Sequence, residues 1–400
     1  MTMTRGKGAV LRDRYLNLDD FEAGARRRLP ESLFSYIASA AEEGRSLAMN
    51  RAAFDRYALL SRVLVDISTA STAVELFGQT FAAPIGIAPM GLAALSAYRG
   101  DLVLARAARA RNVPMIMSGS SLIRLEEVIA EIPETWFQVY LPGDQEQIDA
   151  LIDRVQNAGV RTLVLTVDIP AFGNREADRR AGFSTPLRPN LQLAWQGISH
   201  PRWTLGVFLR TILRHGMPHF ENNFASRGVP ILSRNVMRDL SARGHLTWDH
   251  ARAIRRKWQG PLLIKGVLHG DDARHAREAG FDGIIVSNHG GRQLDGAIAP
   301  LDALPRVLDQ AGGLPVLLDS GIRRGTDVVK ALALGAKAVL IGRPFNFAAA
   351  VGAQEGVELA IDLICTELLR NMKMMGVTDL SQLTPDLMTE TAMTPARPLP

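Results

Sequence analysis

Eight short apolar segments, each followed by a helical pattern, predict an α/β fold: a (β/α)₈ TIM barrel. Two further observations favour this fold. Polar residues gather where the apolar segments end, and 400 residues with 47% hydrophobic and 22% charged content suffice for one large catalytic domain. The expected strands are residues 84–90, 113–119, 136–141, 162–168, 261–267, 283–289, 315–321 and 338–343.

Helix-like stretches lie between these strands. We expect helices at 101–111, 145–158, 273–279 and 326–334, the last with Thr326 as its N-cap. Glycine precedes the following strand in several units, where it suits the left-handed end of a helix. These glycines are Gly159, Gly280 and Gly335.

The spacing of the strands indicates one domain over 1–400 with additions to the barrel. Strands four and five are much farther apart than the other pairs, so an insertion follows strand four on the active-site face. An N-terminal helical extension, with helices at 19–28 and 31–43, precedes the barrel. The expected parts are the extension 1–80, the barrel 81–177 and 258–350, the insertion 178–257, and C-terminal helices with a tail at 351–400.

Composition excludes several function classes. The formal net charge is +5 and no zinc-finger, RNP or helix-turn-helix pattern accompanies it, so we do not expect nucleic-acid binding. A single cysteine cannot form an intrachain disulfide. The N-terminus lacks an apolar signal region and no segment has the length of a membrane span, so we expect a cytoplasmic protein that can contact a membrane surface.

Polar residues at the carboxyl ends of the strands predict the active site, because chemistry in such barrels collects at that face. The last two strands carry a phosphate signal: glycines and arginines in 319–325 and 341–343 can hold a phosphate on backbone amides and guanidinium groups. Glycines that only form turns are the alternative. The strand-end residues are Pro89, Met90, Gly91, Ser118, Gln138, Tyr140, Thr166, Asp168, Lys265, Ser287, Asn288, His289, Asp319, Gly321, Gly342 and Arg343.

His289 is the candidate general base. Asp168 ends another strand and can orient the imidazole, while Arg292 lies three residues farther on and can bind an anionic substrate. A base, an orienting carboxylate and an anion clamp are therefore all available, although a lone histidine is more often structural.

The motif Ser287-Asn-His-Gly-Gly-Arg-Gln-Leu-Asp295 resembles the signature of the FMN-dependent L-2-hydroxy-acid dehydrogenase and oxidase family. That family includes glycolate oxidase, flavocytochrome b₂, membrane L-lactate dehydrogenase and (S)-mandelate dehydrogenase, and the chain looks most like the last two. The similarity runs from about Phe21 to about Leu383. It includes residues 29–30, 50–54, 136–140, 165–168, 263–266 and 319–327.

The resemblance implies roles for seven residues in substrate oxidation. His289 looks like the base and Asp168 like its partner. Lys265 looks like the cation near flavin N1 and O2, where negative charge accumulates on reduction. The others are the carboxylate clamp Arg175 and Arg292, and the hydroxyl donors Tyr36 and Tyr140.

The resemblance also implies bound FMN. The family positions that line the isoalloxazine and ribityl chain are matched here by Pro89, Met90, Gly91, Ser118, Gln138 and Thr166. Ser287 and Lys265 are expected beside them. The ribityl and phosphate site matches Asp319, Gly321, Arg323, Gly342 and Arg343. Met90 replaces a threonine common in the family, Gly91 is similar to the dehydrogenase branch, and Ser120 replaces the tryptophan of short-chain glycolate oxidases, which suggests a roomier pocket.

Residues 198–215 of the insertion form a basic amphipathic pattern. An apolar stripe of Trp203, Val207, Phe208, Ile212 and Leu213 beside Arg202, Arg210 and Arg214 can lie in a membrane interface. A lid helix packed on the barrel rim is the alternative. The loop resembles that of the membrane-associated mandelate dehydrogenase, which implies a quinone acceptor and a peripheral place on the inner face of the cytoplasmic membrane. The family resemblance also favours a homotetramer.

Three other functions remain open. One is a soluble oxidase of the same family that reduces oxygen to hydrogen peroxide. The second is a flavin- or phosphate-binding barrel kept for a non-catalytic interaction. The third is an isomerase with a phosphate substrate or a nucleotide dehydrogenase, and the lack of a cysteine at a barrel loop argues against the latter. The sequence does not decide which 2-hydroxy acid is used.

Overall fold

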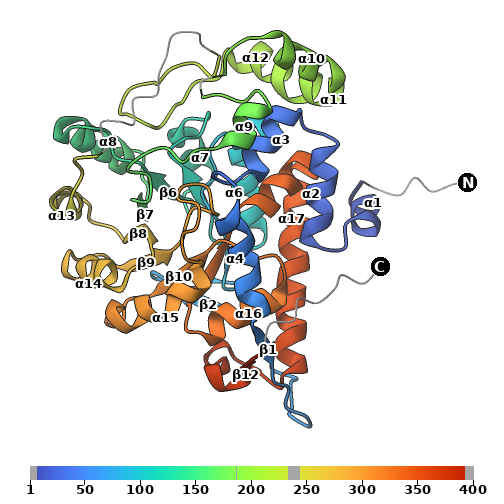
Figure 1. Cartoon of the computed structure of the whole chain (residues 1–400), viewed down its shortest axis with the longest axis vertical. Coiled ribbons are helices and arrows are strands. Elements are labelled where there is room, and N and C mark those ends of the chain that lie inside the picture. Colours follow the sequence, from blue (N-terminus) through green and yellow to red (C-terminus); the bar gives the residue numbers. More distant parts are fainter. Residues whose placement is uncertain (1–6, 186, 233–243, 392–400) are drawn as a thin grey trace, which may run out of the picture.

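A computed structural model describes residues 7–185, 187–232 and 244–391 and has a barrel at its centre (Figure 1). Eight parallel strands pair in the order β4-β11-β10-β9-β8-β7-β6-β5. A parallel bridge between Ile87 and Met115 joins the two ends of this order and closes the ring. The strands are β4 (Ile85–Ile87), β5 (Ile116–Ser118), β6 (Trp136–Val139), β7 (Leu163–Thr166), β8 (Leu262–Val267), β9 (Gly283–Val286), β10 (Val316–Asp319) and β11 (Ala338–Ile341).

The predicted barrel is confirmed, and each strand lies inside its expected segment. The observed strands are shorter because the last residues of several segments leave the ladder and turn into the site. Alternation along the strands divides their side chains between two cores. One core fills the barrel with side chains such as Trp136, Leu263 and Leu317. The other packs the outward side chains, such as Phe137 and Ile264, against the helices.

A hairpin of β2 (Val74–Leu76) and β3 (Gln79–Phe81) contributes to the core inside the barrel. Phe77 at its turn approaches Gly283 at the first residue of β9, where an added Cβ would lie 2.8 Å from the phenylalanine ring. The hairpin therefore closes the amino-terminal end of the barrel. The opposite end stays available for chemistry.

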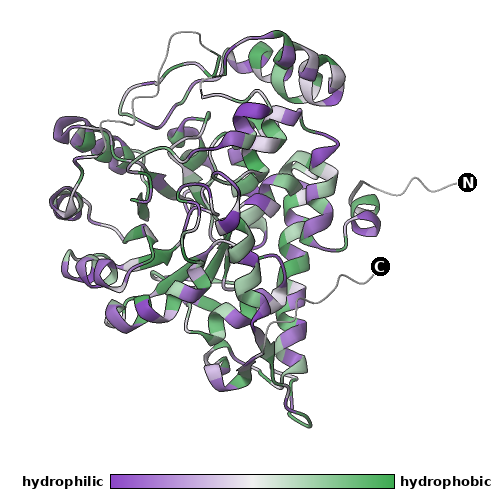
Figure 2. Cartoon of the chain, in the orientation of Figure 1, coloured by the Kyte–Doolittle hydropathy of each residue, from purple (hydrophilic) through white to green (hydrophobic). Residues whose placement is uncertain are grey.

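Helices surround the strands, with hydrophilic residues toward the outside (Figure 2). Gly159, Gly280 and Gly335 have φ of 84°, 79° and 104°, so the predicted left-handed helix ends are confirmed. The helices are α5 (Ala93–Ser96), α6 (Gly100–Ala110), α7 (Leu125–Glu131), α8 (Gln145–Asn157), α13 (Trp248–Lys257), α14 (Gly270–Glu278), α15 (Pro300–Ala311), α16 (Gly325–Ala333) and α17 (Arg343–Met374).

The predicted N-cap of α16 is wrong. The helix begins at Gly325 and Arg324 is its N-cap, so Thr326 lies inside the first turn. The cause is Asp327, whose carboxylate accepts hydrogen bonds from the backbone N–H of Arg323 at 2.8 Å and of Arg324 at 3.0 Å. Because Asp327 accepts hydrogen bonds from these two preceding amides, the helix begins before Thr326.

The N-terminal extension contains α1 (Lys7–Arg14), α2 (Leu18–Arg26), α3 (Glu31–Ala38) and α4 (Arg45–Asp55). It also contains β1 (Tyr57–Leu59), which pairs antiparallel with β12 (Met388–Glu390) after the short 3₁₀ turns η3 (Leu380–Gln382) and η4 (Pro385–Leu387). The expected helix 31–43 ends early, at Ala38. Ser39 is extended there, and its carbonyl accepts hydrogen bonds from Arg292 and Arg343 of the barrel.

The insertion forms a helical layer above the barrel, seen at the top of Figure 1. Gln196 anchors it: its buried side chain accepts a hydrogen bond from the Ser32 amide at 3.0 Å and donates one to the Ala181 carbonyl at 3.1 Å. No helix in the described ranges is long and apolar enough to cross a membrane. The helices are α9 (Glu176–Arg180), α10 (Leu191–Ser199), α11 (Pro201–Trp203), the π-helical turn η1 (Thr204–Leu209) and α12 (Arg210–His215).

The predicted apolar stripe of the insertion is partly wrong. Trp203, Val207, Phe208 and Ile212 are half-buried, and the Trp203 indole donates to the Leu95 carbonyl at 2.7 Å. Trp203 packs against the barrel and Phe208 stacks on Trp203 at 5.6 Å, as the lid alternative expects. The π-helical turn has more residues per turn than an α-helix and so rotates the exposed face. That face carries Leu205, Leu209 and Leu213 of η1 and α12 and Leu191, Trp195 and Ile198 of α10.

Candidate active site

A cavity of about 580 Å³ opens at the carboxyl ends of the barrel strands. It is bounded by the loops after these strands, by α3 of the N-terminal extension and by the start of the insertion. Tyr36, Tyr140, Arg175, His289 and Arg292, the five expected substrate contacts, all line it. The fold therefore brings together at one cavity five residues that are far apart along the chain.

The expected cofactor residues divide into two groups. Nine line the cavity: Pro89, Met90, Gly91, Lys265, Asp319, Gly321, Arg323, Gly342 and Arg343. The others do not border it directly and are buried at the ends of their strands: Ser118, Gln138, Thr166 and Ser287.

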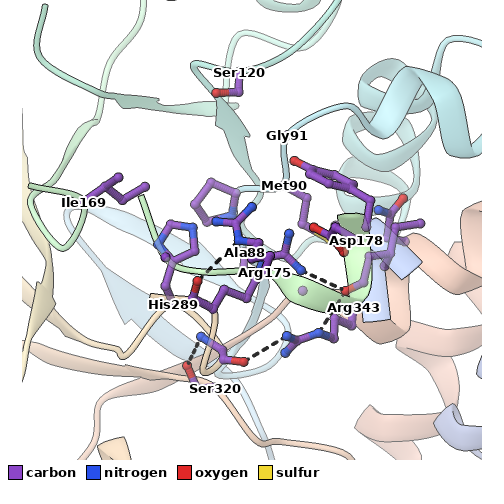
Figure 3. Close-up of a pocket in the computed structure, with 18 of the residues that line it drawn as sticks. Ala88, Met90, Gly91, Ser120, Ile169, Arg175, Asp178, His289, Ser320 and Arg343 are labelled. Atoms are coloured by element: carbon purple, nitrogen blue, oxygen red, sulfur yellow. Dashed lines mark hydrogen bonds between the residues drawn. The ribbon is translucent and has the colours of Figure 1, made fainter. Parts of the chain in front are cut away.

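His289 lines the cavity (Figure 3) and is held in one orientation by Asp168 and Ser287. Its Nδ1 lies 2.9 Å from Asp168 Oδ1, and its backbone N–H donates to the Ser287 hydroxyl at 3.0 Å. The residue has φ of 56°, a conformation that non-glycine residues rarely adopt and that turns the ring toward the cavity. With Nδ1 donating to the carboxylate, Nε2 is the ring atom that can accept a proton.

The electrostatic surroundings keep His289 neutral and Asp168 charged. Burial lowers the pKa of His289 below 6.5, and the nearby carboxylate only partly offsets this effect. Burial alone would raise the pKa of Asp168, but His289 and Lys265 outweigh it and the pKa lies below its usual value. A neutral imidazole beside a carboxylate is ready to accept a proton.

Lys265 forms a buried network with two other strand-end residues. Its ammonium group lies 2.9 Å from the Ser287 hydroxyl and 2.9 Å from Asp319 Oδ2, and that hydroxyl donates to Asp319 at 2.7 Å. The Lys265 side chain is only 3% exposed. Burial opposes its charge, but Asp319 and Asp168 raise its pKa above the usual value. The lysine is thus a fixed cation at the cavity.

Arg292 and Arg175 form a cationic pair on the substrate side. Arg292 donates to the Ser39 carbonyl at 3.0 Å and lies 5.0 Å from the centre of the Tyr36 ring. Arg175 Nε donates to the Arg292 carbonyl at 3.3 Å. Burial, reinforced by Arg175, lowers the pKa of Arg292 to about 10. Two crowded, desolvated cations of this kind favour an anion between or beside them.

The predicted phosphate site, formed by the loops after β10 and β11, contains two further arginines. Arg343 donates to the carbonyls of Ile37, Ser39 and Gly290 at 2.8–3.0 Å, and burial lowers its pKa to about 9. Burial also lowers the pKa of Arg323, which neighbours Arg51. Both arginines line the cavity beside the glycines of the last two barrel loops.

The comparisons with known proteins decide the family. Residues 25–390 match the model of a family described as FMN-dependent dehydrogenase. The chain belongs to this family. Membership of this family confirms two predictions: the enzyme is an FMN-dependent oxidoreductase, and its cofactor is FMN.

Named relatives cover nearly the whole chain. An L-lactate dehydrogenase of Xanthomonas campestris pv. campestris (strain 8004) is 42% identical over 372 residues, which cover 92% of this chain and 95% of that protein. An L-lactate dehydrogenase of Alcaligenes faecalis is 40% identical over 374 residues, 92% of this chain and 97% of that protein.

Solved structures with the same fold include a monotopic membrane protein, (S)-mandelate dehydrogenase. It has a TM-score of 0.84 and 32% identity, and the match covers 94% of this chain and 100% of that one. A mandelate oxidase has a TM-score of 0.76 and 33% identity, and the match covers 92% and 97% of the two chains. The solved relatives therefore include both dehydrogenases and oxidases.

Buried polar atoms at the strand ends agree with an FMN site. Gln138 Nε2 and Thr166 Oγ1 have no hydrogen-bond partner within the described ranges. An unsatisfied buried donor is costly, so a ligand that reached these strand ends would gain hydrogen bonds from both groups. The ring nitrogens and carbonyls of a flavin are suitable partners for the amide and the hydroxyl. Arg323 and Arg343, in the predicted phosphate site, suit the phosphate group at the other end of FMN.

Sequence analysis missed three residues of the site. Asp178 on α9 accepts hydrogen bonds from Ser35 at 3.3 Å and Ser39 at 2.5 Å, which ties the helix after Arg175 to the end of α3. Phe183 stacks on the Tyr36 ring at 4.5 Å. Asn223 enters from the segment of the insertion that follows α12. Asp178 could have been found because it follows the predicted clamp residue Arg175 by three positions. Nothing in the sequence marks Asn223.

Proposed function

We propose that this FMN-dependent dehydrogenase oxidises an L-2-hydroxy acid of the lactate or mandelate type to the 2-oxo acid, with His289 as the base. The observation that carries the proposal is the His289–Asp168 pair, because its His289 lines the same cavity as Arg175, Arg292 and Lys265. The lactate and mandelate dehydrogenases among the relatives support this substrate class.

Substrate binding is assigned to the residues from α3, β6 and the two loops that carry arginine. Arg175 and Arg292 hold the carboxylate by charge-assisted hydrogen bonds. Tyr36 and Tyr140 donate hydroxyl hydrogen bonds to the substrate oxygens. Together they place C2 of the substrate next to His289, and such positioning is a large part of catalysis.

The chemical step uses three groups of the chain. His289 Nε2 accepts the proton of the substrate hydroxyl, and Asp168 stabilises the resulting imidazolium. The C2–H bond breaks as the 2-oxo acid forms, and FMN, when bound, would supply the acceptor for the C2 hydrogen and the electron pair of that bond. Lys265 stabilises negative charge at that end of the cavity, as a fixed and already desolvated cation does best.

Arg292→Lys tests the carboxylate clamp. A lysine keeps the charge but cannot make the two-pronged contact of a guanidinium group, and a hydrogen bond to a charged group contributes about 1.5–3 kcal/mol. We expect KM to rise by about 10- to 100-fold in steady-state kinetics. Arg180→Lys, at an exposed arginine of α9, is the matched control. An unchanged KM in Arg292→Lys would assign the clamp to other residues.

We also propose that electrons pass to a membrane quinone and that the protein is peripheral on the inner face of the cytoplasmic membrane. The support is the exposed apolar face of α10, η1 and α12, from which Trp195 and Leu213 project at 68% and 84% exposure. Arg202 and Arg214 are exposed beside them and suit anionic lipid, whereas the Arg210 guanidinium stacks on the Tyr98 ring at 3.8 Å. The solved relative described as a monotopic membrane protein agrees with this location. A homotetramer remains a prediction.

The membrane proposal has a direct test. We expect replacing Leu205, Leu209 and Leu213 together by glutamine to weaken binding to anionic vesicles by about 100-fold or more, because each buried leucine contributes about 1.5–3 kcal/mol. Co-sedimentation at low and high salt measures the binding. The control replaces Leu16, Val63 and Met374, which are exposed outside the insertion, in the same way.

One second function is favoured by a specific observation. A mandelate oxidase is among the solved relatives, so a soluble oxidase that reduces oxygen to hydrogen peroxide is the alternative. If the unaltered protein ignores vesicles and turns over rapidly with oxygen alone, the oxidase assignment replaces the membrane one.

A further inference from the structure

The cavity continues past Gly91 toward the loop after β5. A Cβ atom added at Gly91 would lie 3.1 Å from the Tyr36 hydroxyl oxygen and 3.1 Å from Ser120 Cβ. The glycine thus leaves open the space between Tyr36 and Ser120. Figure 3 shows Ser120 and Ser320 at opposite ends of the view, with His289 between them. Under the proposed function, the side chain of a substrate held at Tyr36 would extend into this space.

The wall of this space is polar. Ser120 and Asn223 both line the cavity, although they are only 7% and 8% exposed. The Ser120 hydroxyl donates to Asn223 Oδ1 at 3.5 Å. Desolvated hydroxyl and amide groups favour a ligand that can hydrogen bond with them over an apolar one.

Asn223 is held firmly by the residues before it. The Glu221 amide donates to the Ser121 carbonyl at 3.2 Å, and the Asn222 side chain donates to the Ile123 carbonyl at 2.8 Å. The segment 221–223 of the insertion is therefore joined to the loop after β5, which also carries Ser120. Such a preorganised pair of polar groups costs little to order when a ligand binds.

The charge balance of the cavity favours an anionic ligand group. Seven cationic side chains line it against two carboxylates, Asp178 and Asp319. Arg323 is paired with Asp19 at 3.6 Å and Lys265 with Asp319 at 2.9 Å, whereas neither Arg179 nor Arg188 pairs with a carboxylate in the described ranges. Both arginines are exposed at the mouth.

We infer that Ser120 and Asn223 form a subsite for a hydrogen-bond acceptor on the substrate side chain, and that 2-hydroxy acids with a second carboxylate fit it best. Arg179 and Arg188 attract such a dianion to the mouth. The inference rests on the proposed function, because it names the side chain of the molecule that His289 oxidises.

A matched pair of substrates tests the subsite. L-malate and L-2-hydroxy-4-methylpentanoate have nearly the same shape, but only L-malate carries the second carboxylate. Anaerobic titration of the FMN-loaded protein gives the rate of flavin bleaching and the dissociation constant for each. We expect the protein to prefer L-malate by about tenfold or more. Asn223→Leu and Ser120→Ala should each lower this preference by about tenfold.

Asn157→Leu, the same substitution at an exposed residue of α8, should keep the full preference. The FMN content and melting temperature of each variant show whether it folds. Equal use of the two acids by the unaltered protein would overturn the inference, and so would an unchanged preference in both folded variants. In those cases lactate or mandelate still bleaches the flavin. If no 2-hydroxy acid bleaches it, the proposed function fails and the subsite assignment fails with it.

Discussion

His289→Gln should lower the rate of flavin reduction by about 10²- to 10⁴-fold while the protein still binds FMN. The glutamine side chain can occupy the space of the imidazole but cannot accept the substrate proton. Stopped-flow absorbance under anaerobic conditions measures the rate, and the FMN content of the purified variant measures cofactor binding. Asp168 and Ser287, which orient the ring, are unaltered.

The pH dependence gives an independent check of the same role. A base must be neutral, and burial lowers the pKa of His289, so the rate should fall only as the pH drops through a value below 6.5. Asp168→Asn removes the group that raises this pKa and should move the fall to still lower pH. A near-normal rate in His289→Gln, or an acid limb above pH 6.5 in the unaltered enzyme, would remove His289 from this role.

Lys265→Met should have the second largest effect, because it removes a cation that is both buried and paired. Breaking a buried ion pair leaves an uncompensated charge on Asp319 and costs about 3–5 kcal/mol of folding stability. The variant also lacks the positive charge at the flavin end of the cavity, so flavin reduction should slow by at least about 100-fold. Chemical denaturation and anaerobic stopped-flow measure the two effects.

The double variant Lys265→Met with Asp319→Asn separates stability from chemistry. Neutralising the unpaired carboxylate should restore most of the free energy of unfolding but not the rate of flavin reduction. If the double variant also recovers the rate, Lys265 acts only in folding and its electrostatic role is wrong.

The barrel could be predicted because its strands are buried on both faces. Segments such as Leu163–Thr166 and Val316–Asp319 are continuous apolar runs, and their polar last residues mark the carboxyl ends where barrels place chemistry. The five proposed substrate contacts could be named as a set only through the family resemblance, since three of them, Tyr36, Arg175 and Arg292, lie outside the predicted strands.

Other features depend on tertiary contacts that local sequence does not show. The end of α3 at Ala38 follows from hydrogen bonds to arginines about 250 to 300 residues away. The exposed face of the insertion was only partly predicted, because a π-helical turn breaks the regular helical period: Leu213 lies on that face, but Trp203 is half-buried. Asn223 reaches the cavity through the packing of the insertion on the loop after β5, and no motif marks it.

Anaerobic mixing of the FMN-loaded enzyme with the L and D forms of lactate and mandelate tests the central claim most directly. We expect the fixed positions of the arginine pair, His289 and the flavin site to admit only one hand of the substrate. We predict that an L-2-hydroxy acid bleaches the oxidised flavin and yields one equivalent of the 2-oxo acid, while its D form does not. Bleaching by neither form, or equally by both, would contradict the account.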